Sequence, residues 1–240
     1  MTLIVDEVML REPNLLVPGK KPVGPVKIDW SHPSANGLVG CYLLNSTAVV
    51  NLAKGKVGNM LPAEGVIKGN NAYFPYHLET GEAEGHLIDL YSDDLMPEAT
   101  IMTSGYQAFV DIGYGRYWTE TGADGSEFTI SNRTTDNRFT LKVGGTAWYI
   151  FGTVSVNPQV VSLSWDQVTG DQRFITQTAK TTRTSAFSPP TNAQVKLGAR
   201  ANYHDYGCEW LYWVYFWNRV ISDKEEANIR LDPYQFLIPA

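Results

Sequence analysis

Short runs of apolar or alternating residues, each followed by turn-forming residues, recur along most of this chain. Residues 37–44, 127–131 and 138–143 are examples, and two glycines follow the last of them. Short strands separated by turn signals are typical of a β-sandwich or barrel. The 240 residues include 21 glycines and 13 prolines, which excludes coiled coils and long helical bundles. The pattern predicts an all-β fold of about a dozen strands.

One short helix is expected near the C-terminus. Ser222 and Glu225 have the spacing of a capping box, in which the serine hydroxyl accepts from the first turn and the glutamate reaches back to the cap. The acidic first turn also suits the positive end of the helix dipole. Because Pro233 disfavours helical backbone at the residue before it, we expect the helix to end at Leu231.

The chain is predicted to have three parts. Residues 1–29 form an extended arm, because four prolines between residues 11 and 25 prevent a helix. Residues 30–231 form the β-domain, and residues 232–240 form an apolar tail that we expect to be buried. The arm and the tail supply candidate contacts with another subunit: Leu15, Leu16, Val17, Phe236 and Leu237.

The segment 210–217 is apolar at every position. Successive side chains of a strand point to opposite faces, so Val214 and Phe216 are expected in the core and Trp213 and Tyr215 on the other face. A strand that is hydrophobic on both faces should be covered on both. The cover could be the arm, the tail or a neighbouring subunit, so Trp213 and Tyr215 are also candidate interface residues.

Charge and hydropathy argue against nucleic-acid and membrane partners. The chain has 19 basic and 25 acidic residues, a net charge of −6, and no basic patch of the kind that binds nucleic acid. No apolar stretch reaches the length of about 18 residues that a membrane span needs. The first ten residues lack the basic start of a secretory leader, so we expect synthesis in the cytoplasm.

Three segments together resemble a laminin-G-like, concanavalin A-like jelly roll. Residues 160–176 look like the family's hairpin, with an apolar strand, Trp-Asp, a Thr-Gly turn and a returning strand. Residues 195–200 resemble a strand with a Leu-Gly pair, and residues 207–231 resemble the last strand, an Asn-Arg corner and a capped helix. This resemblance implies a two-sheet antiparallel sandwich with one short C-terminal helix.

The two ends resemble head- and tail-associated proteins of tailed bacteriophages. The residues that carry this likeness lie at 13–22, 28–33, 37–40 and 232–236. It implies a non-enzymatic structural protein on the virion surface, as a capsid decoration, head fibre or tail adhesin. Its expected partners are capsid or tail subunits, further copies of itself and host-surface glycans. The alternatives are a bacterial carbohydrate-binding or adhesion module and, with less support, a concanavalin-like glycoside hydrolase.

The two cysteines, Cys41 and Cys208, have no spacing of a zinc site. They fall on the first and last strands of the domain, which in sandwiches of this kind can lie side by side. A disulfide would need their Cα atoms within about 7 Å. Cytoplasmic synthesis favours two buried thiols instead.

No catalytic residue is expected. Glycosidases of this fold use two carboxylates that flank the bond, but the acidic clusters at 79–84 and 89–94 lie in a turn and beyond a strand end. There is no G-x-S-x-G sequence, and the four histidines lie in unrelated contexts; His32 is expected to complete a turn.

No cofactor is expected either. Laminin-G-like domains often hold calcium, and oxygen ligands could come from Asp93, Asp94, Asp111, Asp124 and Glu127. The dense acidic loop of a calcium site is missing, so ordinary surface acids are the favoured interpretation.

Aromatic residues accompany polar ones in segments 114–118 and 203–206, which we predict to be loops. Rings beside Asp or Arg suit sugars, whose C–H faces stack on the ring while their hydroxyls form hydrogen bonds. The alternative is that these rings close the ends of the sandwich or contact a subunit. The candidate carbohydrate-binding residues are Arg116, Tyr117, Trp118, Tyr203, Asp205 and Tyr206.

Overall fold

The computed structural model divides the chain into two compact units, residues 1–38 with 221–240 and residues 39–220. The boundaries predicted after residues 29 and 231 stay a prediction. The residues that the structure describes are 19–22, 24–45, 48–61, 66–68, 71–73, 87–91, 98–106, 115–121, 127–133, 138–143, 146–151, 159–186, 194–197 and 210–240.

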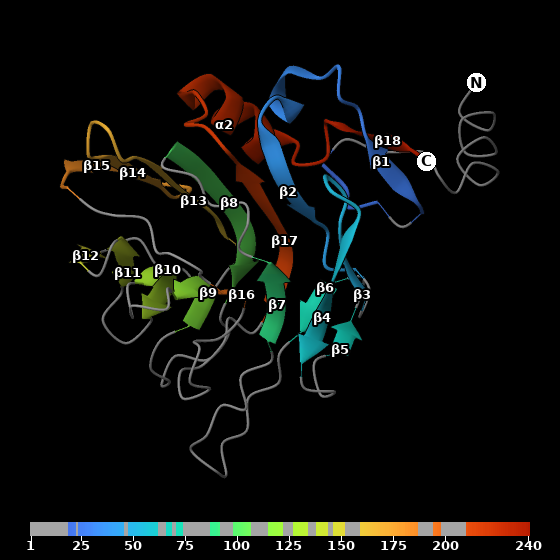
Figure 1. Ribbon diagram of the computed structural model, residues 1–240, viewed down its shortest axis with the longest axis horizontal. Coiled ribbons are helices and arrows are strands. Elements are labelled where there is room, and N and C mark those ends of the chain that lie inside the picture. The colour runs from blue at the N-terminus through green and yellow to red at the C-terminus, as the bar shows by residue number, and fades with distance from the viewer. Residues whose placement is uncertain are drawn as a thin grey trace, which may run out of the picture. The chain divides into compact units, whose positions relative to one another are not determined.

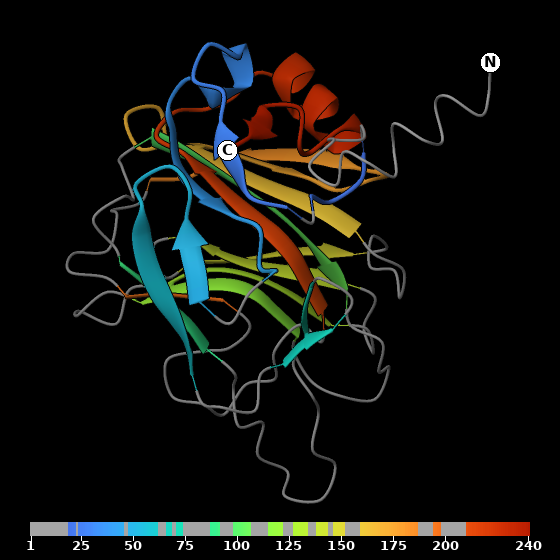
Figure 2. The same cartoon turned by 90° about the vertical axis from the view of Figure 1, so that its right-hand side faces the viewer.

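The larger unit is built from two antiparallel sheets, which Figure 2 shows as separate layers. The first sheet has eight strands in the order β12-β11-β10-β9-β16-β7-β4-β3. They are β3 (Ala48–Asn51), β4 (Lys56–Leu61), β7 (Leu87–Tyr91), β9 (Gly115–Thr121), β10 (Glu127–Arg133), β11 (Arg138–Val143), β12 (Thr146–Phe151) and β16 (Gln194–Leu197).

The second sheet has the order β15-β14-β13-β8-β17-β6-β5, and β2 also pairs with β17. The first five of these strands run side by side in Figure 1. The strands are β2 (Leu38–Tyr42), β5 (Val66–Lys68), β6 (Asn71–Tyr73), β8 (Glu98–Tyr106), β13 (Gln159–Asp166), β14 (Asp171–Ile175), β15 (Lys180–Thr184) and β17 (Trp210–Trp217).

The hydrophobic core lies between these two sheets. Ile130 and Phe139 from the first sheet and Leu163 and Phe174 from the second belong to one buried cluster. The rings of Phe139 and Phe174 meet with their centroids 5.2 Å apart. The predicted two-sheet antiparallel sandwich is therefore confirmed.

The core-facing side of β17 changes at an irregularity in its pairing with β8. The register shifts between Leu211 and Trp213, as it does at a β-bulge. This shift lets Leu211 belong to the same core cluster as Val214 and Phe216, although a regular alternation would separate odd from even positions. The predicted core positions of Val214 and Phe216 are confirmed.

The other face of β17 carries a row of three aromatic rings. Trp213 and Tyr215 stack with centroids 4.5 Å apart, and Tyr215 meets Trp217 edge-on at 6.0 Å. The exposed fractions of Trp213 and Tyr215 are 2 % and 0 % within a single chain. The expectation that this face is sheltered from water is confirmed, while the role of the two residues in an interface stays a prediction.

The smaller unit contains the predicted helix and a two-stranded ribbon. Helix α2 (Asp223–Leu231) has both halves of the capping box: the Ser222 hydroxyl accepts from the Glu225 amide at 3.2 Å, and the Glu225 carboxylate accepts from the Ser222 amide at 2.9 Å. Strand β1 (Val26–Ile28) pairs antiparallel with β18 (Leu237–Pro239). The end of the predicted arm is thus a strand that pairs with the tail.

The tail is buried in part: Phe236 and Leu237 are 0 % and 3 % exposed, as expected, whereas Ile238 is 38 % exposed. The Asp232 carboxylate accepts from the Gly19 amide at 3.1 Å, which ties the start of the described chain to the end of α2. Leu15, Leu16 and Val17 lie outside the described residues, so their interface role stays a prediction.

His32 completes a turn, as expected. It caps the 3-10 helix η1 (Pro33–Ala35), and its Nδ1 accepts from the Ser34 amide at 3.2 Å. Cys41 is a buried free thiol, and burial raises its pKa. A buried thiol with a raised pKa is chemically inert. Cys208 lies outside the described residues.

Candidate binding site

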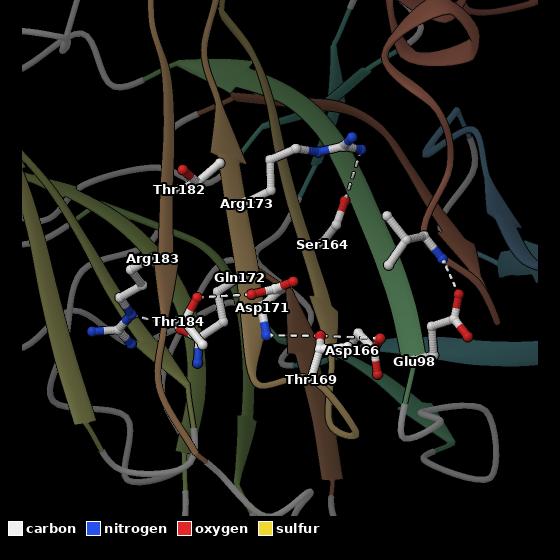
Figure 3. A pocket seen from close by; sticks show the side chains of 11 residues that line it. Glu98, Ser164, Asp166, Thr169, Asp171, Gln172, Arg173, Thr182, Arg183 and Thr184 are labelled. Atoms are coloured by element: carbon white, nitrogen blue, oxygen red, sulfur yellow. Dashed lines mark hydrogen bonds between the residues drawn. The ribbon is translucent and has the colours of Figure 1, made fainter.

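A polar pocket lies in the larger unit, along the outer face and the edge of β13, β14 and β15 (Figure 3). Its volume is about 630 Å³. Most of its lining comes from side chains that point away from the core, since Leu163 and Phe174 of the same strands face inward. The lining residues are Glu98, Ser164, Asp166, Thr169, Asp171, Gln172, Arg173, Thr182, Arg183, Thr184 and Val220.

The turn between β13 and β14 builds one end of the pocket. The Asp166 carboxylate accepts from the Val168 amide at 2.8 Å and from the Thr169 hydroxyl at 3.1 Å. Gly170 has φ +76°, a left-handed conformation that glycine adopts without strain. The predicted Thr-Gly turn at 169–170 is confirmed, and both oxygens of Asp166 are used to hold it.

Two further carboxylates lie at this end, and each uses one oxygen in a hydrogen bond to another described residue. Asp171 Oδ1 accepts from the Thr184 hydroxyl at 2.8 Å, and Glu98 Oε1 accepts from the Val220 amide at 3.0 Å. Both side chains are exposed. Within the described residues, Asp171 Oδ2 and Glu98 Oε2 keep their capacity to accept further hydrogen bonds.

Arg173 forms the other end and is held by a chain of hydroxyl groups. Its Nη2 lies 3.2 Å from Ser164 Oγ, which lies 3.1 Å from Thr100 Oγ1. Thr100 Oγ1 in turn lies 2.9 Å from the Arg219 carbonyl oxygen.

The direction of these hydrogen bonds follows from the chemistry of the groups. A carbonyl only accepts, so Thr100 donates its single hydroxyl proton to Arg219. Ser164 must then donate to Thr100 and accept from Arg173. Thr100 and Ser164 are 0 % and 1 % exposed, so this chain fixes the guanidinium from within the protein.

Strand register places these side chains in two neighbouring rows. Glu98 lies opposite Asp166, and Asp171 lies opposite Thr184, across the ends of four adjacent strands. The next row along the same face contains Thr100, Ser164, Arg173 and Thr182. Residues two positions apart on a strand are separated by about 7 Å. The pocket therefore has an acidic row and, about 7 Å away, a row of hydroxyls with one guanidinium.

Arg183 borders the pocket but is held by other groups. Its Nε donates to Gln172 Oε1 at 2.7 Å, and its guanidinium lies 4.8 Å from the centre of the Trp148 ring. Burial lowers the pKa of Arg183 below its ordinary value. Because Trp148 belongs to β12 of the first sheet, Arg183 joins the two sheets at this edge.

The predicted carbohydrate-binding residues are not among the described residues that line this pocket. Arg116, Tyr117 and Trp118 were expected in a loop, but they lie in β9, which pairs with β10 on one side and β16 on the other. Tyr, Trp and Thr favour strands, and this propensity was the signal that the loop interpretation overlooked. Tyr203, Asp205 and Tyr206 lie outside the described residues. Contact between these six residues and a sugar stays a prediction.

Sequence reasoning missed the pocket residues as a group. Ser164 and Asp166 alternate along β13, Asp171 and Arg173 along β14, and Thr182 and Thr184 along β15. The alternation indicates a polar face on each strand. It does not say that the three strands are neighbours.

The described part of the chain contains no group of three or more histidine, cysteine, aspartate or glutamate side chains that could hold a metal ion. Of the calcium candidates, Glu127 lies in β10. Asp93, Asp94, Asp111 and Asp124 lie outside the described residues. No helix within the described ranges is both long and apolar enough to cross a membrane.

Comparison with known proteins identifies the fold. No family model matches the sequence, and no curated protein matches it. Among solved structures, a Trypanosoma rangeli sialidase in complex with sialic acid aligns with 98 % of this chain and 39 % of its own, at a TM-score of 0.66 and 11 % identity. This chain therefore spans well under half of that sialidase.

Two smaller proteins are similar as well. A SAP-like pentraxin from Limulus polyphemus has a TM-score of 0.53 at 13 % identity over 67 % of this chain and 80 % of its own. The CBM40 domain of a Ruminococcus gnavus IT-sialidase, bound to α2,3-sialyllactose, has a TM-score of 0.50 at 15 % identity over 62 % of this chain and 93 % of its own. These similarities show that the chain has a lectin-like, concanavalin-type β-sandwich fold.

Proposed function

We propose that this protein is a non-catalytic glycan-binding protein and that the pocket between Glu98 and Arg173 holds the sugar. The observation that carries the proposal is the pairing of an acidic row with a row of hydroxyls and a guanidinium on one face of the second sheet. Carboxylates accept, guanidinium groups donate and hydroxyls do both. Sugar hydroxyls also do both, so each row offers a partner to them.

The size and rigidity of the pocket also support the proposal. Small-molecule sites typically enclose about 300–1,000 Å³ and contain a few polar groups in fixed positions. The buried hydroxyl chain fixes Arg173, and the Asp166 turn fixes one end of the acidic row. A preorganised site loses less conformational entropy when a ligand binds. The sugars bound to the CBM40 domain and to the sialidase are compatible with this use of the fold.

The arrangement of the carboxylates favours binding over catalysis. Retaining glycosidases place two carboxyl groups about 5–5.5 Å apart on either side of the bond. Asp166 already accepts with both oxygens. Glu98 and Asp171 belong to β8 and β14, two strand spacings apart, which is about 10 Å between backbones.

A glycan array tests this proposal and distinguishes the pocket from the residues chosen from sequence. We expect the double variant Arg173→Ala/Asp171→Ala to lose at least about tenfold in affinity, a change of about 1.4 kcal/mol. Lys180→Ala, on β15 outside the pocket, is the matched control. No cleaved sugar should form during long incubation.

Two outcomes would contradict the proposal in different ways. If Trp118→Ala/Tyr206→Ala abolishes binding while the pocket variant binds normally, the sugar site is the one predicted from sequence. If the wild-type protein binds no glycan on a broad array, the glycan-binding function itself is wrong.

We also propose that the protein is displayed on the surface of a bacteriophage particle, after synthesis in the host cytoplasm. The support is the resemblance of residues 13–22, 28–33, 37–40 and 232–236 to head- and tail-associated proteins. Its partners would be capsid or tail subunits and further copies of itself. A bacterial adhesion module is the alternative.

Deletion of residues 1–18 tests the particle role. This deletion leaves β1 and its pairing with β18 intact, because β1 begins at Val26. We expect the shortened protein to fold and to be missing from purified particles. Incorporation of the shortened protein at the normal level would contradict the role of residues 1–18 in attachment. Absence of the full-length protein from purified particles would contradict the particle role itself.

A further inference from the structure

We infer that the pocket discriminates sugars by charge, favouring an amino sugar over a neutral one and disfavouring a carboxylated one. This inference rests on the proposed glycan-binding function and adds the ligand class. It comes from how the charged groups of the pocket are arranged and from which of their atoms are already used.

The acidic row has unused hydrogen-bonding capacity among the described residues. Asp171 Oδ2 and Glu98 Oε2 accept no hydrogen bond within the described residues, and both side chains are exposed. These two carboxylate oxygens can only accept hydrogen bonds, so they suit ligand groups whose polar hydrogens all donate. An ammonium group has three donors and a positive charge, so it suits this row better than a hydroxyl does.

The basic groups offset this acidity only in part. The lining contains three carboxylates, on Glu98, Asp166 and Asp171, and two guanidinium groups, on Arg173 and Arg183. Arg183 is engaged with Gln172 and stacked on Trp148, at the edge where the two sheets meet. Arg173 is therefore the cation that lies in the row next to the carboxylates.

A carboxylated sugar would gain no strong electrostatic attraction at any position along the pocket. Near the acidic row it would face like charges directly. Near Arg173 its attraction to one guanidinium would be opposed by carboxylates about 7 Å away. Charges at a protein surface still interact at such separations, so the opposing effects largely cancel. An amino sugar with its ammonium at the acidic row is attracted by the carboxylates there and is opposed by the single guanidinium of Arg173, about 7 Å away.

An array of immobilised sugars in matched sets tests the inference. Each set contains a hexose, the hexosamine of the same stereochemistry and the corresponding hexuronate. In the set that the wild-type protein binds best, we expect the hexosamine to bind more tightly than the hexose. We expect the hexuronate to bind at least about tenfold more weakly than the hexosamine. The difference should shrink in high salt, because salt screens exposed charges.

The variants Glu98→Gln and Asp171→Asn, combined, remove two charges and keep the acceptor oxygens for Val220 and Thr184. We expect the ratio of hexosamine to hexuronate affinity to fall at least about threefold, with a smaller change for the neutral hexose. Asp29→Asn, at a half-buried residue of the other unit, is the control for overall charge and should leave the ratio unchanged.

The outcomes separate this inference from the proposed function. Binding that is strongest for hexuronates, or a ratio unaffected by Glu98→Gln/Asp171→Asn, would overturn the charge selectivity and leave glycan binding in place. Loss of binding only in Trp118→Ala/Tyr206→Ala would move the site and overturn the inference. Absence of binding to every sugar in the array would overturn both.

Discussion

Gly40, in β2, lies against the aromatic core of the larger unit. A Cβ atom at this position would come within 2.5 Å of Phe216 Cδ2 and 3.1 Å of Tyr42 Cε2. Those two rings already meet edge-on, with centroids 6.0 Å apart. Gly40 therefore allows β2 to approach β17 as closely as the core requires, and a methyl group here has no room.

We predict that Gly40→Ala destabilises the protein by about 1–3 kcal/mol, the typical cost of overpacking a core. Chemical denaturation measures the change in the free energy of unfolding. Phe216→Leu shortens the opposing side chain. Gly40→Ala should therefore cost less free energy of unfolding in a Phe216→Leu background than it does in the wild type. A Gly40→Ala protein within 0.5 kcal/mol of the wild type, the range of ordinary surface substitutions, would contradict the steric argument.

At the scale of single elements, helix α2 depends on its first turn. The unbonded amides at a helix start are satisfied here by the reciprocal Ser222 and Glu225 contacts. The last turn is fixed by a buried pair, since Arg230 lies 2.6 Å from Glu226, whose side chain is 1 % exposed. The two ends of the helix are thus held by different interactions.

We predict that Ser222→Ala destabilises the helix by about 1 kcal/mol, because alanine cannot accept the Glu225 amide hydrogen bond. Amide hydrogen exchange should show faster opening in the first turn of α2 and little change in the second sheet. Ser222→Asp, which retains an acceptor at the cap, should exchange like the wild type. Equal exchange rates for the alanine and aspartate variants would mean that the cap contributes nothing.

At the scale of the whole molecule, the outer face of β17 forms a second buried layer. Trp213, Tyr215 and Trp217 are nearly inaccessible to water within one chain, on the side of the sheet opposite the main core. Large rings bury about 150–250 Å² each, so this layer contributes substantially to the folding free energy. Its burial does not require a second copy of the chain.

We predict that Trp213→Ala costs about 3–5 kcal/mol, the usual range for a buried tryptophan. Tyr149→Ala, at a ring that is 49 % exposed, is the control and should cost much less. Because the rings are covered within one chain, the free-energy cost of Trp213→Ala should be the same over about a hundredfold range of protein concentration. A cost that grows with protein concentration would show that a second copy stabilises this layer.

Local patterns in the sequence were sufficient for several elements. Residues 138–143 were predicted as a strand and form β11 with the same bounds, because apolar and polar residues alternate there before a glycine pair. The capping box and Pro233 were sufficient to locate the two ends of α2, because each of these signals acts within one turn of the helix. The shelter of Trp213 and Tyr215 also followed from residues adjacent in the sequence.

Only the tertiary structure decided the position of the polar strands and the pocket. Strand β15 contains Lys, Thr and Arg but no apolar residue, so its sequence alone does not indicate a strand; it is stabilised by pairing with β14 at the edge of the sheet. The residues that hold Arg173 are far apart along the chain, with Thr100 and Ser164 separated by 64 positions. Such groups become neighbours through strand order, which long-range packing determines and local patterns do not encode. The sequence by itself thus determined the sandwich class, the helix and the two-sided burial of β17, and the tertiary structure determined which polar side chains share one pocket.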